Sequence, residues 1–172
     1  MSVKRDQQDL MIKEAYRKWQ VLKIEVREAR GLLNLAVGVM QLELEQVQAR
    51  MMDDLERLDD EIASICTEIK VAYGKAGGKS SLNDADGVRV WRQVGRELEG
   101  QLKLRKIERR KLILQMGALA DESLRCGEYW ESYTELAKET EELRSNLERL
   151  QHEAEKARSN YRQIVFQEKL AV

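Results

Sequence analysis

The sequence contains no proline, one histidine and few aromatic residues, and each shortage narrows the structures and chemistries open to it. Proline breaks helix interiors because it lacks a backbone N–H and its ring clashes with the preceding turn. Its absence therefore leaves long helices uninterrupted. Aromatic residues make up 5% of the chain and charged residues 35%. This composition favours long helices with charged surfaces over a compact mixed fold.

The single histidine, His152, leaves out most of the usual apparatus of catalysis. A zinc site built on two histidines is excluded, and nothing around His152 suggests the pocket of a Ser-His-Asp triad. Acidic residues are abundant, but their pattern is that of solvated helical faces, whereas burial is what raises a catalytic pKa. We therefore expect no enzyme activity, no catalytic residue, no metal ion and no cofactor.

Long apolar runs, a large net charge and a set of cysteines are also missing. The richest apolar stretch, residues 31–44, is shorter than the roughly 20 residues that cross a membrane. The net charge is −1, so no whole-chain field attracts nucleic acid or an anionic membrane. Cys66 and Cys126 are too few for a disulfide scaffold, and residues 1–10 lack a secretion signal. These features predict a cytoplasmic protein with no membrane partner.

Apolar residues from Ile12 to Ala72 recur at alternating steps of three and four, which is the coiled-coil pattern. The pattern stops at a segment rich in glycine and serine, and a second periodic run follows it. We predict a helix over residues 2–73, a loop over 74–83 and a helix over 84–170. Because a short loop between long helices favours antiparallel neighbours, the predicted fold is an all-α, antiparallel two-helix coiled-coil hairpin over residues 1–172.

Charges along the two predicted helices support this pairing. With a turn near residue 79, residues 1–30 (eight basic, five acidic) face residues 128–157 (four basic, nine acidic). The alternative is a four-helix bundle in which both helices bend where Gly31 would face Gly127. An interior glycine costs a helix roughly 1 kcal/mol relative to alanine, which favours a joint at these two positions.

The most apolar stretch carries two stripes rather than one. The predicted seam uses Leu33, Val37, Met40 and Leu44. A second stripe, centred roughly 150° away around the helix, consists of Leu32, Leu35, Val39 and Leu42. One partner helix cannot cover both faces, and a left-over apolar stripe usually marks an interface. We expect it to pair two hairpins into a homodimer with a four-helix arrangement, to dock another protein, or to be covered by a bent hairpin.

A basic run lies in the second predicted helix. Six of its nine residues are Lys or Arg, namely Lys103, Arg105, Lys106, Arg109, Arg110 and Lys111. Such a patch can bind phosphates. However, the acidic run from Asp53 to Glu61 would lie nearby in the hairpin, and no aromatic platform accompanies the basic run. We therefore expect an ion-paired, solvated face, with nucleic acid or an acidic protein as the alternative.

Two segments resemble ligand-binding loops, but each lacks residues that its motif requires. Gly74–Ser80 resembles a phosphate-binding loop, but Tyr73 stands where the first glycine is needed and no strand precedes it. Asp84 and Asp86 resemble part of a calcium loop, yet its first and last ligand positions cannot supply carboxylates. Helix capping explains these aspartates better. The aromatic cluster Tyr129–Tyr133 is expected to pack in the core, with an anchor pocket for a protein partner as the alternative.

The leading functional hypothesis is a non-enzymatic structural or adaptor coiled coil. It would self-associate, dock a protein partner through the second apolar stripe, or do both. The alternative is a nucleic-acid-associated helical rod that uses residues 103–111.

Overall fold

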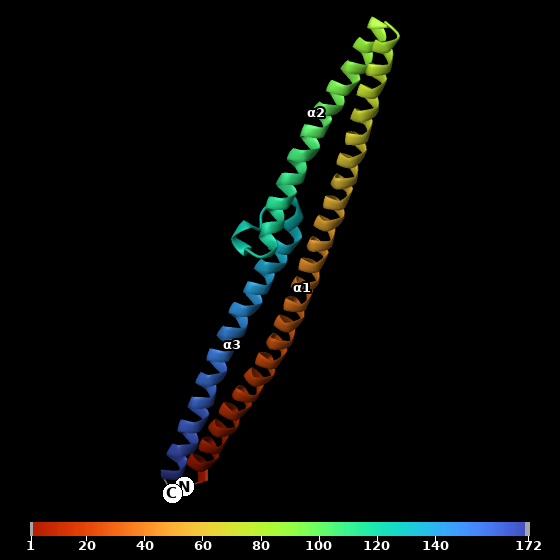
Figure 1. Ribbon diagram of the computed structural model, residues 1–172. Coiled ribbons are helices and arrows are strands. Elements are labelled where there is room, and N and C mark those ends of the chain that lie inside the picture. Colours follow the sequence, from red (N-terminus) through yellow and green to blue (C-terminus); the bar gives the residue numbers. More distant parts are fainter. Residues whose placement is uncertain (1, 171–172) are drawn as a thin grey trace. The chain divides into compact units, whose positions relative to one another are not determined.

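The computed structural model describes the backbone of residues 2–170 and the side chains of residues 7–168. Its long helices are α1 (Ser2–Ser81), α2 (Ala85–Met116) and α3 (Glu131–Leu170), shown in Figure 1. Three short 3-10 helices connect α2 to α3: η1 (Gly117–Leu119), η2 (Glu122–Leu124) and η3 (Glu128–Trp130). The prediction of an all-helical chain is confirmed, since the described residues form no strand. None of their helices is long and apolar enough to cross a membrane.

The first helix ends later than predicted, because the segment expected to be a loop over residues 74–83 is mostly helical. Its glycines weaken a helix by only about 1 kcal/mol each, which burial of neighbouring side chains offsets. Ala72 and Ala76 are both buried on this last part of α1. The turn is therefore confined to residues 82–84, where Asn83 adopts a left-handed conformation with φ 57°.

The turn residues close both helix ends with hydrogen bonds. The backbone N–H of Asp84 donates to the carbonyl of Lys79 over 3.0 Å. The Asp84 carboxylate then accepts the N–H of Gly87 over 2.9 Å and pairs with the Lys79 ammonium over 3.1 Å. This cap lowers the pKa of Asp84, first through the Gly87 N–H and then through Lys79. The capping role predicted for this aspartate is thus present in the structure.

The second predicted helix, over residues 84–170, is interrupted between Met116 and Glu131. Gly127 adopts φ +89°, a conformation that residues with a Cβ rarely take. Arg125 gathers the carbonyls at the end of η1: its Nε donates to Ala118 over 3.0 Å and its Nη2 to Leu119 over 3.4 Å. Two features therefore accompany the break: the backbone conformation of Gly127 and the hydrogen bonds that Arg125 donates to carbonyls at the end of η1. By contrast, α1 is helical throughout the region of Gly31.

The chain divides into two compact units, each of which contains part of α1. The first unit contains residues up to 43 and residues from 132 onward. Its core joins the first half of α1 to α3 and consists of Leu22, Ala29, Leu147, Leu150 and Ala157, with Trp19, Val26, Leu33 and Ala154 packed against it.

An aromatic cluster fixes the register within this first unit. The ring of Tyr161 lies 5.4 Å from that of Tyr16 and is stacked 5.8 Å from that of Trp19. The predicted register instead placed residues 142 and 139 opposite these two. It was wrong here because it assumed a continuous second helix, whereas residues 117–130 are not part of α2 or α3.

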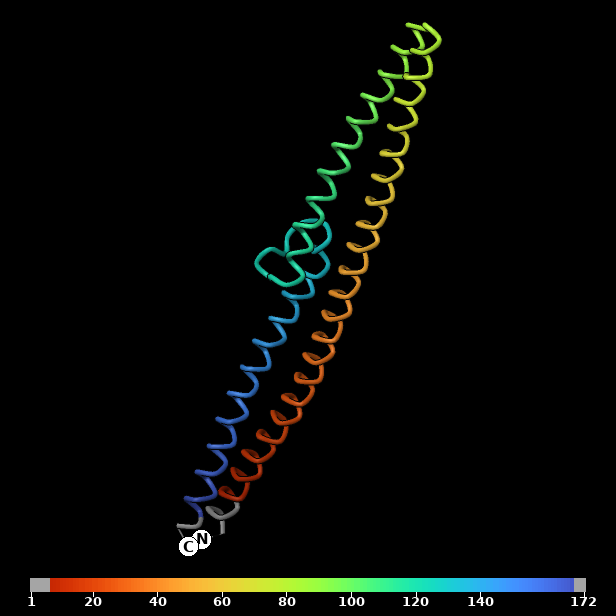
Figure 2. Tube along the Cα trace, in the orientation of Figure 1, coloured from red at the N-terminus to blue at the C-terminus, as the bar shows by residue number. Residues whose placement is uncertain are grey.

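The second unit, residues 44–131, contains the rest of α1, α2 and the 3-10 segment. Figure 2 shows α1 and α2 side by side in this unit, joined by the turn at residues 82–84. Contacts pair Asp59 with Arg109 and Glu61 with Arg105, so the two segments run in opposite directions. Nearer the turn, the ammonium of Lys75 lies 4.3 Å from the ring centre of Trp91. The most completely buried side chains are Val47, Met51, Ala118 and Trp130.

One glycine in α2 is required by packing. A Cβ on Gly95 would lie 2.8 Å from Cζ of Tyr73, whereas a Cβ on Gly100 would meet nothing within 4 Å. The Tyr73 hydroxyl donates to Glu99 over 3.0 Å, which holds the ring over Gly95. Close approach of α1 and α2 at this point therefore depends on the missing side chain.

We expect Gly100→Ala to raise the free energy of unfolding by about 0.5–1 kcal/mol, because alanine is the better helix former. Gly95→Ala should instead lower it, since the new methyl group displaces the Tyr73 ring. Urea unfolding of both variants measures the difference. In a Tyr73→Ala background Gly95→Ala should become stabilising, and a continued loss there would contradict the packing explanation.

Candidate interaction surfaces

The second apolar stripe lies on the surface of the first unit. Its members are between 47% and 69% exposed: Leu32, Leu35, Val39 and Leu42. Leu33, one residue from Leu32, packs against the core of the unit. The same helix therefore presents one apolar face to α3 and a second to solvent.

The most apolar part of the chain is also one of its least buried parts. No side chain between Ala29 and Val47 is buried. Val37, which was predicted to lie in the seam, is 48% exposed, and Met40 is half-buried. The prediction for Val37 was wrong because its position lies at the edge of the seam, about 40° from Leu33 at 100° per residue.

The stripe extends further than the sequence analysis proposed. Val21 and Ile24 are about half exposed, and helical geometry of about 100° per residue places them on the same face. Only Glu28 interrupts the series, at the position between Ile24 and Leu32. This charge divides the apolar periodicity into two shorter series, so the sequence pattern alone predicts only the second of them. We call this extended stripe the outer face of α1; it consists of Val21, Ile24, Leu32, Leu35, Val39 and Leu42.

The basic run on α2 is paired only in part. Arg105 lies between Glu61 at 2.8 Å and Glu108 at 2.7 Å, and Arg109 binds Asp59 through its guanidinium. Arg109 also lowers the pKa of Asp59 through this hydrogen bond. The other four predicted residues are exposed and form no ion pair with any described residue: Lys103, Lys106, Arg110 and Lys111. The expectation of an ion-paired face thus holds for two of the six side chains.

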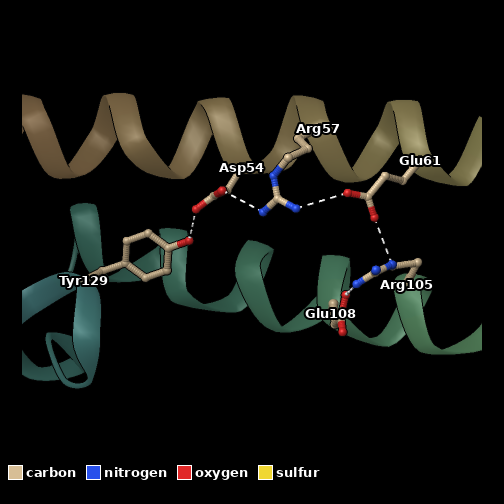
Figure 3. Close-up of polar contacts among 6 residues, drawn as sticks. All are labelled: Asp54, Arg57, Glu61, Arg105, Glu108 and Tyr129. Carbon is tan, nitrogen blue, oxygen red and sulfur yellow. Dashed lines mark hydrogen bonds and ion pairs between the residues drawn. The ribbon is translucent and has the colours of Figure 1, made fainter.

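Figure 3 shows a chain of polar contacts that joins α1 to α2 and η3 inside the second unit. The Tyr129 hydroxyl donates to Asp54, which also accepts a 2.8 Å hydrogen bond from Arg57. Arg57 in turn pairs with Glu61 over 3.1 Å, and Glu61 pairs with Arg105. Charges alternate along this chain, so every carboxylate meets a donor. The network positions the start of η3 against α1.

The same network sets the protonation of Tyr129 and Asp54. Burial, followed by the hydrogen bond to Asp54, raises the pKa of Tyr129 to about 12. The hydrogen bonds from Tyr129 and Arg57 lower the pKa of Asp54. Tyrosine therefore stays protonated and aspartate ionised near neutral pH. This arrangement suits a structural link better than proton transfer, because general acid–base groups have a pKa near the working pH.

The raised pKa of Tyr129 predicts that the free energy of unfolding falls at alkaline pH. Its pKa in the folded chain lies above its unfolded value of about 10, so its contribution to stability is complete below pH 10. This contribution should be lost as the pH rises toward 12. We expect Tyr129→Phe to remove this part of the alkaline decline in unfolding free energy. Tyr161→Phe serves as the control, and equal alkaline curves for wild type and Tyr129→Phe would contradict the assignment.

The remaining candidate groups are dispersed. Cys66 is half-buried and Cys126 exposed, and neither forms a disulfide. Within the described part of the chain, no group of three or more His, Cys, Asp or Glu is arranged to hold a metal ion. Trp130 and Tyr133 of the predicted aromatic cluster are buried, whereas Tyr129 is half-buried and faces Asp54.

The chain matches no known protein-family model, and no curated protein or solved structure shows significant similarity to it. Its function is therefore inferred from its own surfaces.

Proposed function

We propose that this protein is a non-enzymatic, cytoplasmic coiled-coil adaptor whose helices pair as an antiparallel hairpin and which self-associates through the outer face of α1. The observation that carries the proposal is the exposure of this apolar face on a helix whose opposite side already packs in a core from Trp19 to Leu33. A soluble chain rarely leaves so long an apolar stripe in water unless another molecule covers it.

The energetic scale is compatible with a dimer. Fully burying one Leu, Ile or Val side chain contributes about 1.5–3 kcal/mol. Association costs roughly 4–15 kcal/mol in lost freedom of motion. Covering one or two of these side chains would not offset that cost, but covering most of the outer face would. The interface must therefore run along several turns of α1.

The outer face is suited to pairing with a second copy of itself. In an antiparallel arrangement centred near Leu32, its Val21–Ile24 end meets the Val39–Leu42 end of the other copy. Such a two-fold contact uses the same patch twice, which is the commonest symmetry of protein dimers. Both ends of the face are apolar, so this pairing opposes no like charges at either end.

The test replaces by glutamate one apolar side chain near the middle of the face, Leu35, and one toward its end, Val39. Leu35→Glu with Val39→Glu should weaken association by at least about 100-fold, because it places carboxylates in an apolar interface. The control, Arg27→Gln with Asn34→Glu, changes the net charge by the same amount at exposed positions on another face of α1.

Light scattering coupled to size exclusion reports the mass of each species. Wild type and control should give twice the chain mass of 20.0 kDa, and the glutamate variant should give the chain mass itself. In a second arm, Glu28→Leu completes the stripe and should tighten the dimer. Equal masses for wild type and the glutamate variant would show that this face does not mediate self-association.

A further inference from the structure

We propose that α2 carries a row of basic side chains that binds the phosphodiester backbone of nucleic acid. The row differs from the predicted basic run because it excludes the two arginines that α1 neutralises and continues toward the start of α2. Its seven members are all exposed: Arg89, Arg92, Arg96, Lys103, Lys106, Arg110 and Lys111.

The row occupies one side of the helix. At about 100° per residue its centre lies roughly 140° from the side that faces α1. That inner side is marked by the buried residues Gly95 and Leu112 and by the ion-paired Arg105 and Arg109. No member of the row pairs with the carboxylates of α1 that bind Arg105 and Arg109, although Arg92 and Arg96 lie close enough to Tyr73 of α1 to act on its hydroxyl.

Neutralising groups are scarce along the row. No member forms an ion pair with a described residue, and the carboxylates of α2 are mostly directed elsewhere. Glu108 binds Arg105, and Glu97 accepts a 2.9 Å hydrogen bond from Gln93. Glu99 lies nearest the row and keeps its negative charge, since the Tyr73 hydroxyl that it accepts is neutral, so one carboxylate stands against the seven cations. A strong local positive potential thus exists on a chain whose net charge is −1.

The geometry of the row matches a linear array of phosphates. From Arg89 to Lys111 it extends about 33 Å. Most neighbours are three or four residues apart, or about 4.5–6 Å along the axis, whereas Arg96 and Lys103 are separated by about 10.5 Å. Nucleic-acid strands carry one charge per roughly 3.4 Å of duplex axis, so the row spans about ten base pairs.

Recognition through this row would be independent of base sequence. The nearest tryptophan, Trp91, lies on the side of α2 that faces α1, where Lys75 covers its ring. No aromatic residue of α2 is therefore available for stacking on bases. The exposed large apolar side chains of α2 are Val90 near its start and Leu104, Ile107, Ile113 and Leu114 toward its end. Between Arg92 and Lys103 no large apolar side chain is exposed beside the cations, which favours a phosphate strand over a membrane surface.

The structure supplies a charge-matched pair of variants for the test. Arg96→Gln with Lys103→Gln removes two cations from the row. Arg105→Gln with Arg109→Gln removes two cations that are already paired with α1. Both lower the net charge by the same amount, and thermal unfolding followed by circular dichroism checks that each variant folds.

Binding is measured by fluorescence anisotropy with a labelled duplex of about 20 base pairs over a salt series. Wild type should bind with a Kd of about 10⁻⁴–10⁻⁶ M at physiological salt. The row variant should raise the Kd about tenfold and reduce the slope of log affinity against log salt by roughly two. The control should stay within about threefold of wild type, since its arginines do not reach the phosphates.

Three outcomes would overturn the proposal. Absence of binding at low salt would remove it, and equal loss in both variants would show that overall charge, not the row, governs retention. Tighter binding to poly-glutamate or to phosphatidylserine vesicles than to the duplex would assign the row to an acidic protein or a membrane instead. None of these results bears on self-association, because the outer face of α1 contains no residue of the row.

Discussion

Trp130→Ala should lower the free energy of unfolding by about 3–5 kcal/mol, the usual cost of removing a buried tryptophan side chain. Trp130 is only 1% exposed, and the guanidinium of Arg125 lies 5.3 Å from its ring centre. Arg125 also binds the carbonyls of Ala118 and Leu119. Loss of the ring would therefore leave a cavity and loosen the arginine that holds the break between α2 and α3.

Urea unfolding measures this loss, and limited proteolysis reports its location. We expect the variant to be cut faster within residues 117–130 than wild type, since local opening becomes easier there. Trp91→Ala is the comparison, because Trp91 is only half-buried and should cost less. A loss below about 1 kcal/mol for Trp130→Ala would contradict a core role for this side chain.

Leu22→Ala should lower the free energy of unfolding by about 2–5 kcal/mol, independently of protein concentration. Leu22 lies in the core between α1 and α3, where its removal leaves a cavity among Ala29, Leu147 and Leu150. Leu35 lies on the same helix but is 69% exposed. Under dilute conditions Leu35→Ala should therefore change stability by less than about 0.5 kcal/mol.

The two variants separate core packing from assembly. Self-association stabilises the folded chain by mass action, so its contribution grows with concentration. Leu35→Ala should thus become increasingly destabilising as concentration rises, while the loss in Leu22→Ala stays constant. Thermal melts over a concentration series provide the comparison. A large effect of Leu35→Ala at the lowest concentration would indicate that Leu35 supports the fold of the single chain instead.

The sequence predicted the helices because the absence of proline and the apolar repeats agree over long stretches. It did not predict where α1 ends, since glycines 74, 77 and 78 suggest a loop while buried Ala72 and Ala76 favour continued helix. The break before α3 was also missed. The apolar spacing stays compatible with a helix across this break, at Met116, Leu119, Cys126, Trp130 and Tyr133. What makes the break is the backbone of Gly127 and the hydrogen bonds of Arg125, and neither has a periodic signature.

The surface features likewise include some that the sequence predicted and some that it did not. Exposure of Leu32, Leu35, Val39 and Leu42 followed from helical geometry alone, because residues on the face opposite a seam cannot reach the same partner helix. The ion pairs within the basic run could not be predicted from helical geometry alone. Composition alone cannot show that Arg105 and Arg109 meet carboxylates of α1 while Arg96 and Lys103 do not, since this depends on the register between two helices.

The most direct test of the central claim is sedimentation equilibrium of the wild-type chain from nanomolar to high micromolar concentration. Self-association through the outer face of α1 predicts a reversible monomer–dimer equilibrium whose heavier species has twice the mass of 20.0 kDa. The equilibrium should shift to monomer in Leu35→Glu with Val39→Glu. A wild-type chain that remains monomeric at every concentration would contradict the claim.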